Sequence, residues 1–407
     1  MTTATRRNHR RSWRLSADTW WCWGYFVALV AVTVVFGRIS YDKTLHAFSD
    51  WIFFEVGARV LVHYQHQNIY TDPRLHLYVD NPDLQIGPPT LWLVAAFEWL
   101  PVRTIYALFS CVMPALGAVA LLAVSRCGPR WPTGRRATLR RAIYVGAGLL
   151  AGAIWSWDID WWKHLDDATA LSLTAVAIYL IVRRRPWWLI GLLLGTAVAA
   201  KPWAIILTPV LLGIGRRELA KTALATIAVA AAWWAPFVIA APDTLQALGH
   251  YPIKAHPGSV LYLVGIRGPV QRWLRPVQFT VGLAVGTITA RRRGIASAPV
   301  AALATRVLTD PYAYPYYGLG PLLFAYLFDR QSVRSRGVLS FTGLTALLEF
   351  GVPRFGHVPP TPVALAKVGW AVIALAWVWL RRPAATPASE LDPRSVAAAD
   401  ASFADGA

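Results

Sequence analysis

Charged residues interrupt the apolar chain at residues 157–168, which read WDIDWWKHLDDA. Acids this close to a bilayer are costly, so they usually have partners or a function. Asp166 and Asp167 stand where the next apolar helix begins, a position that favours anions. His164 lies three residues before Asp167, a spacing that could bind a cation or a sugar. The alternative is a solvated loop that caps the helix. A lone His among flexible acids is a weak metal signature, and we predict no metal.

Lys201-Pro202 interrupts the apolar stretch 186–214. A lysine is a compact point charge that binds phosphate well. The helix start after a proline adds backbone N–H donors beside it. These features predict that Lys201 contacts a phosphate group. The alternative is a lysine that extends its ammonium to the membrane interface.

The segment TDPYAYPYYGLGP, residues 309–321, is rich in tyrosine and proline. Proline keeps the backbone irregular, which at membrane depth is tolerated only beside protein or a water-filled cavity. Tyr312, Tyr316 and Tyr317 could stack on a sugar or contact a lipid headgroup. The alternative is an aromatic belt at the membrane interface. The sequence contains no Walker motif, Gly-rich nucleotide loop or Ser-His-Asp order.

Asp50 lies in a long loop, residues 37–87, that follows the first apolar segment. Residues 48–64 after it show roughly helical apolar spacing, which predicts an amphipathic helix on the membrane surface. A carboxylate at this place could act as general base toward a sugar hydroxyl. The alternative role for Asp50 is to cap the helix that it begins.

The composition is that of a membrane protein. Of 407 residues, 56% are hydrophobic and 15% charged, and the chain contains 21 Trp. Mean hydropathy is +0.41. A spanning helix needs about 20 mostly apolar residues. Candidate spans are 19–36, 88–124, 142–157, 166–182, 186–200, 202–214, 222–241, 277–290, 295–308, 315–328, 337–350 and 363–380. We therefore predict an all-α, polytopic transmembrane helical bundle of about 10–13 spans, with twelve preferred.

Arginine clusters orient this bundle. They recur in short groups between apolar segments, at 6–14, 126–141, 183–185, 216–221, 291–293, 330–336 and 381–382. Basic loops stay in the cytoplasm. We predict a multi-pass protein of the cell membrane with a basic cytoplasmic N-terminus (1–18), a membrane domain (19–382) and a disordered cytoplasmic tail (383–407). Such scattered clusters exclude a compact nucleic-acid surface, despite the formal charge of +19.

Four segments together resemble the GT-C membrane glycosyltransferases, especially the actinobacterial polyprenol-phosphate-mannose-dependent α-mannosyltransferases. They are SDWIFFEVGARVLVHYQHQNIYTDP, IGPPTLWLVAAFEWLP, TDPYAYPYYGLGP and the stretch from KHLDDATALSL to AAKPWAIILTPVLL. The likeness spans most of residues 40–325. Its most specific part is an Arg-rich turn followed by a Gly-rich helix and Ala-Ala-Lys-Pro, which ends at residue 202.

The resemblance implies transfer of a sugar, mannose first, from a polyprenyl-phosphate donor to a lipid-linked or glycan acceptor on the outer face. Asp50 would be the catalytic base, with inversion at the anomeric carbon. Lys201 and His164 would contact the donor phosphate, and Tyr312 to Tyr317 would line the pocket. No cofactor is required, because the donor arrives activated. Arabinofuranosyl transfer is one alternative. A transporter or lipid flippase is another, although the charges gather at one surface.

Overall fold

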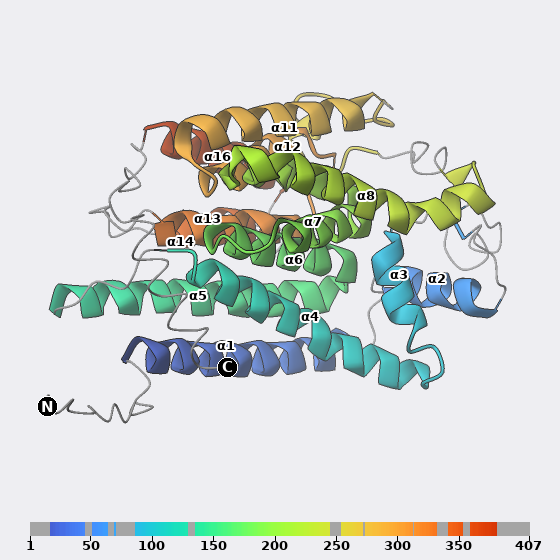
Figure 1. Cartoon of the computed structure of the whole chain (residues 1–407), viewed down its shortest axis with the longest axis horizontal. Coiled ribbons are helices and arrows are strands. Elements are labelled where there is room, and N and C mark those ends of the chain that lie inside the picture. The colour runs from blue at the N-terminus through green and yellow to red at the C-terminus, as the bar shows by residue number, and fades with distance from the viewer. Residues whose placement is uncertain are drawn as a thin grey trace, which may run out of the picture.

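The computed structural model describes residues 17–44, 51–63, 69–70, 86–128, 135–244, 254–271, 273–311, 313–331, 341–352 and 359–380. Within these ranges the regular structure is helical, and an isolated bridge pairs Lys254 with Pro269. The long helices lie side by side along the long axis of the molecule, and the short helix α3 (Pro88–Ala95) lies across it (Figure 1). The prediction of an all-α bundle is confirmed at this level.

Five helices among the described residues are long and apolar enough to cross a membrane. They are α4 (Val102–Ser125), α5 (Arg135–Trp162, spanning from Arg141), α6 (Leu165–Val182), α8 (Arg216–Ala240) and α16 (Pro360–Leu380). The chain is therefore an all-helical protein with helices of membrane-spanning length and composition. A total of about twelve spans stays a prediction.

Further apolar elements complete the bundle and lie close to the expected ranges. They are α1 (Ala17–Thr44), α7 (Trp187–Ala200), the 3₁₀ helix η2 (Pro202–Gly213), α11 (Leu274–Arg293), α12 (Ser297–Thr309), α13 (Leu319–Gln331) and α14 (Phe341–Thr345) with its π-helical continuation η4 (Ala346–Gly351). The short elements α10 (Val260–Leu263) and η3 (Pro315–Gly318) connect them. Proline begins η2 and recurs inside it at Pro209. Because proline has no N–H to donate, it weakens ordinary α-helical bonding there.

The stretch 88–124 forms one long helix and one short one. The short helix is α3 (Pro88–Ala95), and α4 begins after Pro101. Proline at the N-cap fits a helix start, because it has no N–H to donate to the preceding turn and its ring clashes with that turn. The sequence had allowed one crossing with a half-helix or two short crossings. Only α4 has spanning length here, so the first alternative is the better one.

The helix predicted at 48–64 is α2 (Trp51–His63). With α3 it occupies one end of the bundle (Figure 1). The Trp51 ring lies 5.3 Å from the Phe109 ring and 6.1 Å from the Tyr106 ring of α4. The apolar face of α2 is thus buried against protein. Its position on the membrane surface stays a prediction.

Gly117 of α4 allows a close contact between α4 and α5. A Cβ at this position would lie 2.3 Å from the Trp155 indole. That ring is buried, and its Nε1 donates a 3.2 Å hydrogen bond to the Met113 carbonyl. The indole therefore has little freedom to move away from a larger residue.

We expect Gly117→Ala to destabilise the bundle by about 1–3 kcal/mol, the usual range for overpacking. Gly146→Ala in α5 is the matched control, because no atom lies within 4 Å of a Cβ built there. Thermal unfolding in detergent should show a lower Tm for the first variant alone. Equal Tm values for the two variants would contradict the rigid contact with Trp155.

Candidate functional site

Two aspartates and a lysine meet at the point where α7 ends and where α6 and η2 begin. Asp166 and Asp167 occupy the first turn of α6, and Lys201 lies between α7 and η2. Lys201 Nζ is 2.5 Å from Asp166 Oδ2 and 3.2 Å from Asp167 Oδ2. The carboxylates also benefit from the N-terminus of α6, whose backbone N–H groups favour negative charge. One bond of this kind is resolved, from the Asp167 N–H to Asp166 Oδ1 at 2.9 Å.

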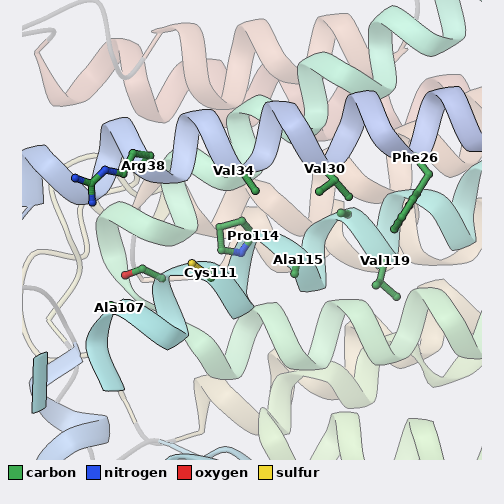
Figure 2. Close-up of a pocket in the computed structure, with 11 residues that line it drawn as sticks. Phe26, Val30, Val34, Arg38, Ala107, Cys111, Pro114, Ala115 and Val119 are labelled. Atoms are coloured by element: carbon green, nitrogen blue, oxygen red, sulfur yellow. The ribbon is translucent and has the colours of Figure 1, made fainter. Parts of the chain in front are cut away.

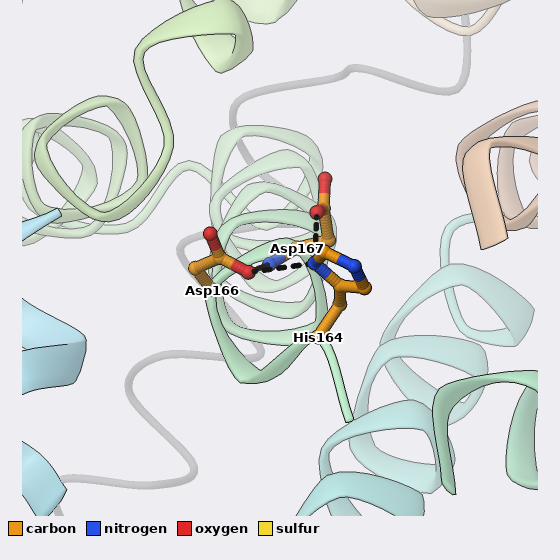
Figure 3. Close-up of side chains that lie close together, drawn as sticks. All are labelled: His164, Asp166 and Asp167. Atoms are coloured by element: carbon orange, nitrogen blue, oxygen red, sulfur yellow. Dashed lines mark hydrogen bonds and ion pairs between the residues drawn. The ribbon is translucent and has the colours of Figure 1, made fainter. Parts of the chain in front are cut away.

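His164 closes this cluster on the other side. Its Nδ1 lies 3.5 Å from both Asp166 Oδ1 and Asp167 Oδ2 (Figure 3). Its ring stacks on Tyr316 with centroids 3.7 Å apart. His164 is the N-cap residue of α6, and its carbonyl accepts the first helical hydrogen bond, from the Ala168 N–H at 3.1 Å. The helix start therefore fixes the imidazole beside both carboxylates.

The network continues through Trp203 to a buried arginine. Trp203 Nε1 donates to Asp167 Oδ1 at 2.9 Å. The Arg306 guanidinium of α12 lies 3.8 Å from the Trp203 ring centroid and 4.9 Å from that of Tyr317. Its Nε is 3.1 Å from Asp310 Oδ2. Cation–π contacts of this kind gain strength when the partners are shielded from water.

The two buried carboxylates determine the charge of Lys201. Both Asp166 and Asp167 are almost fully buried. Burial alone would lower the pKa of Lys201, but Asp166 and Asp167 outweigh it and raise that pKa above its ordinary value. Lys201 is therefore charged at neutral pH. Removing one partner of such a group leaves an uncompensated buried charge, which is strongly destabilising.

Aromatic rings form a wall beside the cluster. The rings of Tyr314 and Tyr316 are nearly parallel, with centroids 5.8 Å apart, and Tyr316 and Tyr317 meet edge to face at 4.5 Å. Trp162 at the end of α5 lies 5.2 Å from Tyr314. His164 already covers one face of the buried Tyr316 ring, so Tyr314 and Tyr317, which are only partly buried, are the rings that a sugar could contact.

Lys163 anchors the turn that carries His164. Its ammonium pairs with Asp160, donates to Ser110 Oγ at 2.6 Å and lies 4.7 Å from the Tyr106 ring centroid. Its φ of 57° lies in the left-handed region, which costs a non-glycine residue about 1–2 kcal/mol. The buried contacts to α4 offset this cost and hold the α5–α6 turn in place.

The structure brings together most of the residues predicted from sequence. His164, Asp166, Asp167 and Lys201 form the cluster, and Tyr316 and Tyr317 lie beside it. The alternative interpretation of residues 157–168 as a solvated loop is wrong, because Asp158, Asp160 and Lys163 are buried as well. A lysine reaching to the interface is also wrong, because the Lys201 side chain is only 14% exposed and is paired with acids. Asp50 and Tyr312 lie outside the described residues.

Sequence reasoning missed Trp203 and Arg306, and it did not assign Asp310 to the site. A usable signal was present: Arg306 is a charge inside the apolar stretch 295–308 and stands four residues before Asp310. Residues at this spacing meet on one helix face. No such local signal marks Trp203, because it joins the cluster only through the fold.

Comparison of the chain with protein-family models and with curated proteins finds no match. The chemistry of the site therefore has to be argued from its residues. One ligand atom each from His164, Asp166 and Asp167 lies within 4.8 Å of the others, a spacing that could hold a cation. Lys201 already places an ammonium against both carboxylates. The cluster can accept hydrogen bonds from sugar hydroxyls and can present positive charge to a phosphate.

We expect Lys201→Met to destabilise the protein by about 3–5 kcal/mol, because it leaves Asp166 and Asp167 buried without their cation. Lys221→Met on α8 is the matched control, since Lys221 is exposed. Denaturant or thermal unfolding in detergent measures the difference. Adding Asp166→Asn to Lys201→Met should recover part of the loss. A Lys201→Met variant as stable as the control would contradict the ion pairing.

Proposed function

We propose that the protein is a membrane glycosyltransferase that moves a sugar, mannose first, from a polyprenyl-phosphate donor to a lipid-linked or glycan acceptor. The observation that carries this proposal is the buried cluster of His164, Asp166, Asp167 and Lys201 beside an aromatic wall. Carboxylates recognise sugar hydroxyls, rings stack on sugar faces, and cations stabilise a departing phosphate. The sequence resemblance to the GT-C class points to the same chemistry.

In the proposed reaction Asp50 removes the proton of the acceptor hydroxyl. The acceptor oxygen then forms a bond to the anomeric carbon from the side opposite the phosphate. The bond from that carbon to the phosphate oxygen breaks, and its electron pair leaves on the polyprenyl phosphate. Attack from the opposite side inverts the configuration, so a β-linked donor gives an α-linked product.

Positive charge for the leaving phosphate comes from Lys201, with His164 beside it. A lysine ammonium has three N–H donors, and the contacts to Asp166 and Asp167 use two of them. A third donor can therefore reach a phosphate oxygen while the aspartates hold the ammonium. Arg306 adds a second cation to the same network through Trp203.

The start of α2 supports a role for Asp50 at this site. Trp51, the next residue, packs against Tyr106, and the Lys163 ammonium lies over the same Tyr106 ring. Lys163 directly precedes His164 in the chain. The beginning of α2 and the turn that carries the cluster are thus connected through one tyrosine.

The direction of the helices supports an orientation with the site on the external face of the cell membrane and both termini in the cytoplasm. The cluster joins the start of α6 to the end of α7, whereas the Arg183–Arg185 turn lies at the opposite end of both helices. η2 leads from the cluster back to that second end, where α8 begins with two arginines. Basic turns at one end are typical of the cytoplasmic side.

We expect Asp50→Asn to lower transfer by about 10²–10⁴-fold, the usual contribution of a general base. The measurement is transfer from radiolabelled polyprenyl-phosphate mannose in membranes that contain the full chain. Asp243→Asn, which changes an exposed acid after α8, is the matched control and should keep normal activity.

Near-normal transfer by Asp50→Asn would refute Asp50 as the base. If wild-type membranes transfer arabinose from the corresponding arabinofuranosyl donor and do not transfer mannose, the proposed donor sugar is wrong. The proposed reaction, glycosyl transfer from a polyprenyl phosphate, is then still supported. Accumulation of labelled substrate in vesicles without a covalent product would favour a transporter instead.

We expect EDTA to leave the transfer rate within about twofold of the untreated rate. The Lys201 ammonium lies against Asp166 and Asp167, where a divalent cation would otherwise bind. A cation of charge +2 would have to displace it. Loss of activity in EDTA that Mn²⁺ or Mg²⁺ restores would show instead that these carboxylates hold a metal.

A further inference from the structure

A groove runs between α1 and α4, with a cavity volume of about 300 Å³ (Figure 2). Its lining from Ala107 to Val119 of α4 covers about 18 Å at 1.5 Å per residue. Phe26 and Val30 of α1 line it together with Val119 at one end. Small residues such as Ala115 form its floor, which leaves room for one hydrocarbon chain.

The other end of the groove is polar. Arg38 lies there, and the lining includes Ser110, whose hydroxyl accepts the hydrogen bond from Lys163 Nζ at 2.6 Å. Pro114, one turn further along α4, has no N–H to donate to the Ser110 carbonyl. The polar end thus combines the Arg38 guanidinium with a serine that accepts a hydrogen bond from the buried Lys163 amino group. A guanidinium matches the geometry of a phosphate.

We infer that this groove binds a lipid phosphate with a single hydrocarbon chain, with the phosphate at Arg38 and the chain extending toward Phe26 and Val119. The charge at one end and the apolar walls along the rest match the two parts of such a molecule. A groove with room for one chain disfavours a two-chain phospholipid. The inference rests on the proposed function only for naming polyprenyl phosphate as the lipid.

Ser110 connects the groove to the candidate site. Lys163 bridges from Ser110 to the turn that carries His164. A phosphate bound at the polar end would therefore lie on the far side of Ser110 and Lys163 from the cluster of His164, Asp166 and Asp167. The position at Arg38 is therefore separate from the one proposed at Lys201, and a lipid phosphate would occupy it before or after transfer.

The test measures lipid binding to the purified full chain by native mass spectrometry, with decaprenyl phosphate as the probe. Ala115→Trp fills the groove from an exposed position on α4, and Ala228→Trp is the matched control on an exposed position of α8. We expect Ala115→Trp to weaken binding by at least tenfold and Ala228→Trp to leave it unchanged. Arg38→Gln should weaken binding of decaprenyl phosphate and not of decaprenol.

Val34→Trp, from the α1 side, supplies a second groove-filling variant if Ala115→Trp fails to fold, because Val34 is 60% exposed. Wild-type affinity in a folded groove-filling variant would overturn the inference. So would equal binding of decaprenol, or equally tight binding of phosphatidylglycerol, by the wild-type chain.

Mannosyl transfer measured on the same preparations separates this inference from the proposed function. Binding that depends on Ala115, together with no transfer of mannose or arabinose, supports the groove and refutes the enzyme. Transfer by the wild-type chain together with unchanged lipid binding in Ala115→Trp supports the enzyme and refutes the groove.

Discussion

The ion pairs between Lys201 and the two aspartates of α6 hold together the end of the bundle that carries the candidate site. They join the first turn of α6 to the junction of α7 and η2. Three helical elements therefore meet at one point. A buried ion pair adds little net stability compared with apolar packing, because both charges lose their hydration. Such a pair is better explained by a requirement for charge at that place. Once both charges are buried, removing either one leaves the other without a partner and strongly destabilises the protein.

The same logic extends outward from the cluster. Asp167 also accepts from Trp203, whose ring faces the Arg306 guanidinium, and Arg306 pairs with Asp310 at the end of α12. Lys163 holds the preceding turn against α4 in a left-handed conformation. Lys163, Lys201 and Arg306 thus each contact an opposite charge. The result is a rigid polar layer, and rigid groups cost no reorganisation when charge develops in a reaction.

Hydropathy and local spacing predicted the features that depend on neighbours in the chain. The helix ranges, the break at Pro101 and the acids at the start of α6 are of this kind, because apolar runs and prolines act over a few residues. The meeting of Lys201 with Asp166 was not specified by spacing, since 35 residues separate them. Arg306 and Trp203 were missed for the same reason: α12 reaches η2 only through tertiary packing. Asp50 and Tyr312 lie outside the described residues, so their roles stay predictions.

The placement of polar groups at the helix ends has a further consequence for the kind of chemistry that fits. A transporter needs charges along a path through the bundle. Here a buried network joins the start of α6, the start of η2 and the end of α12, and the basic turns lie at the other ends of α6 and η2. A polar layer at one end, with an apolar groove between α1 and α4 leading from Ser110, suits a substrate whose reactive head is polar and whose tail stays in the membrane. A lipid-linked sugar is such a substrate.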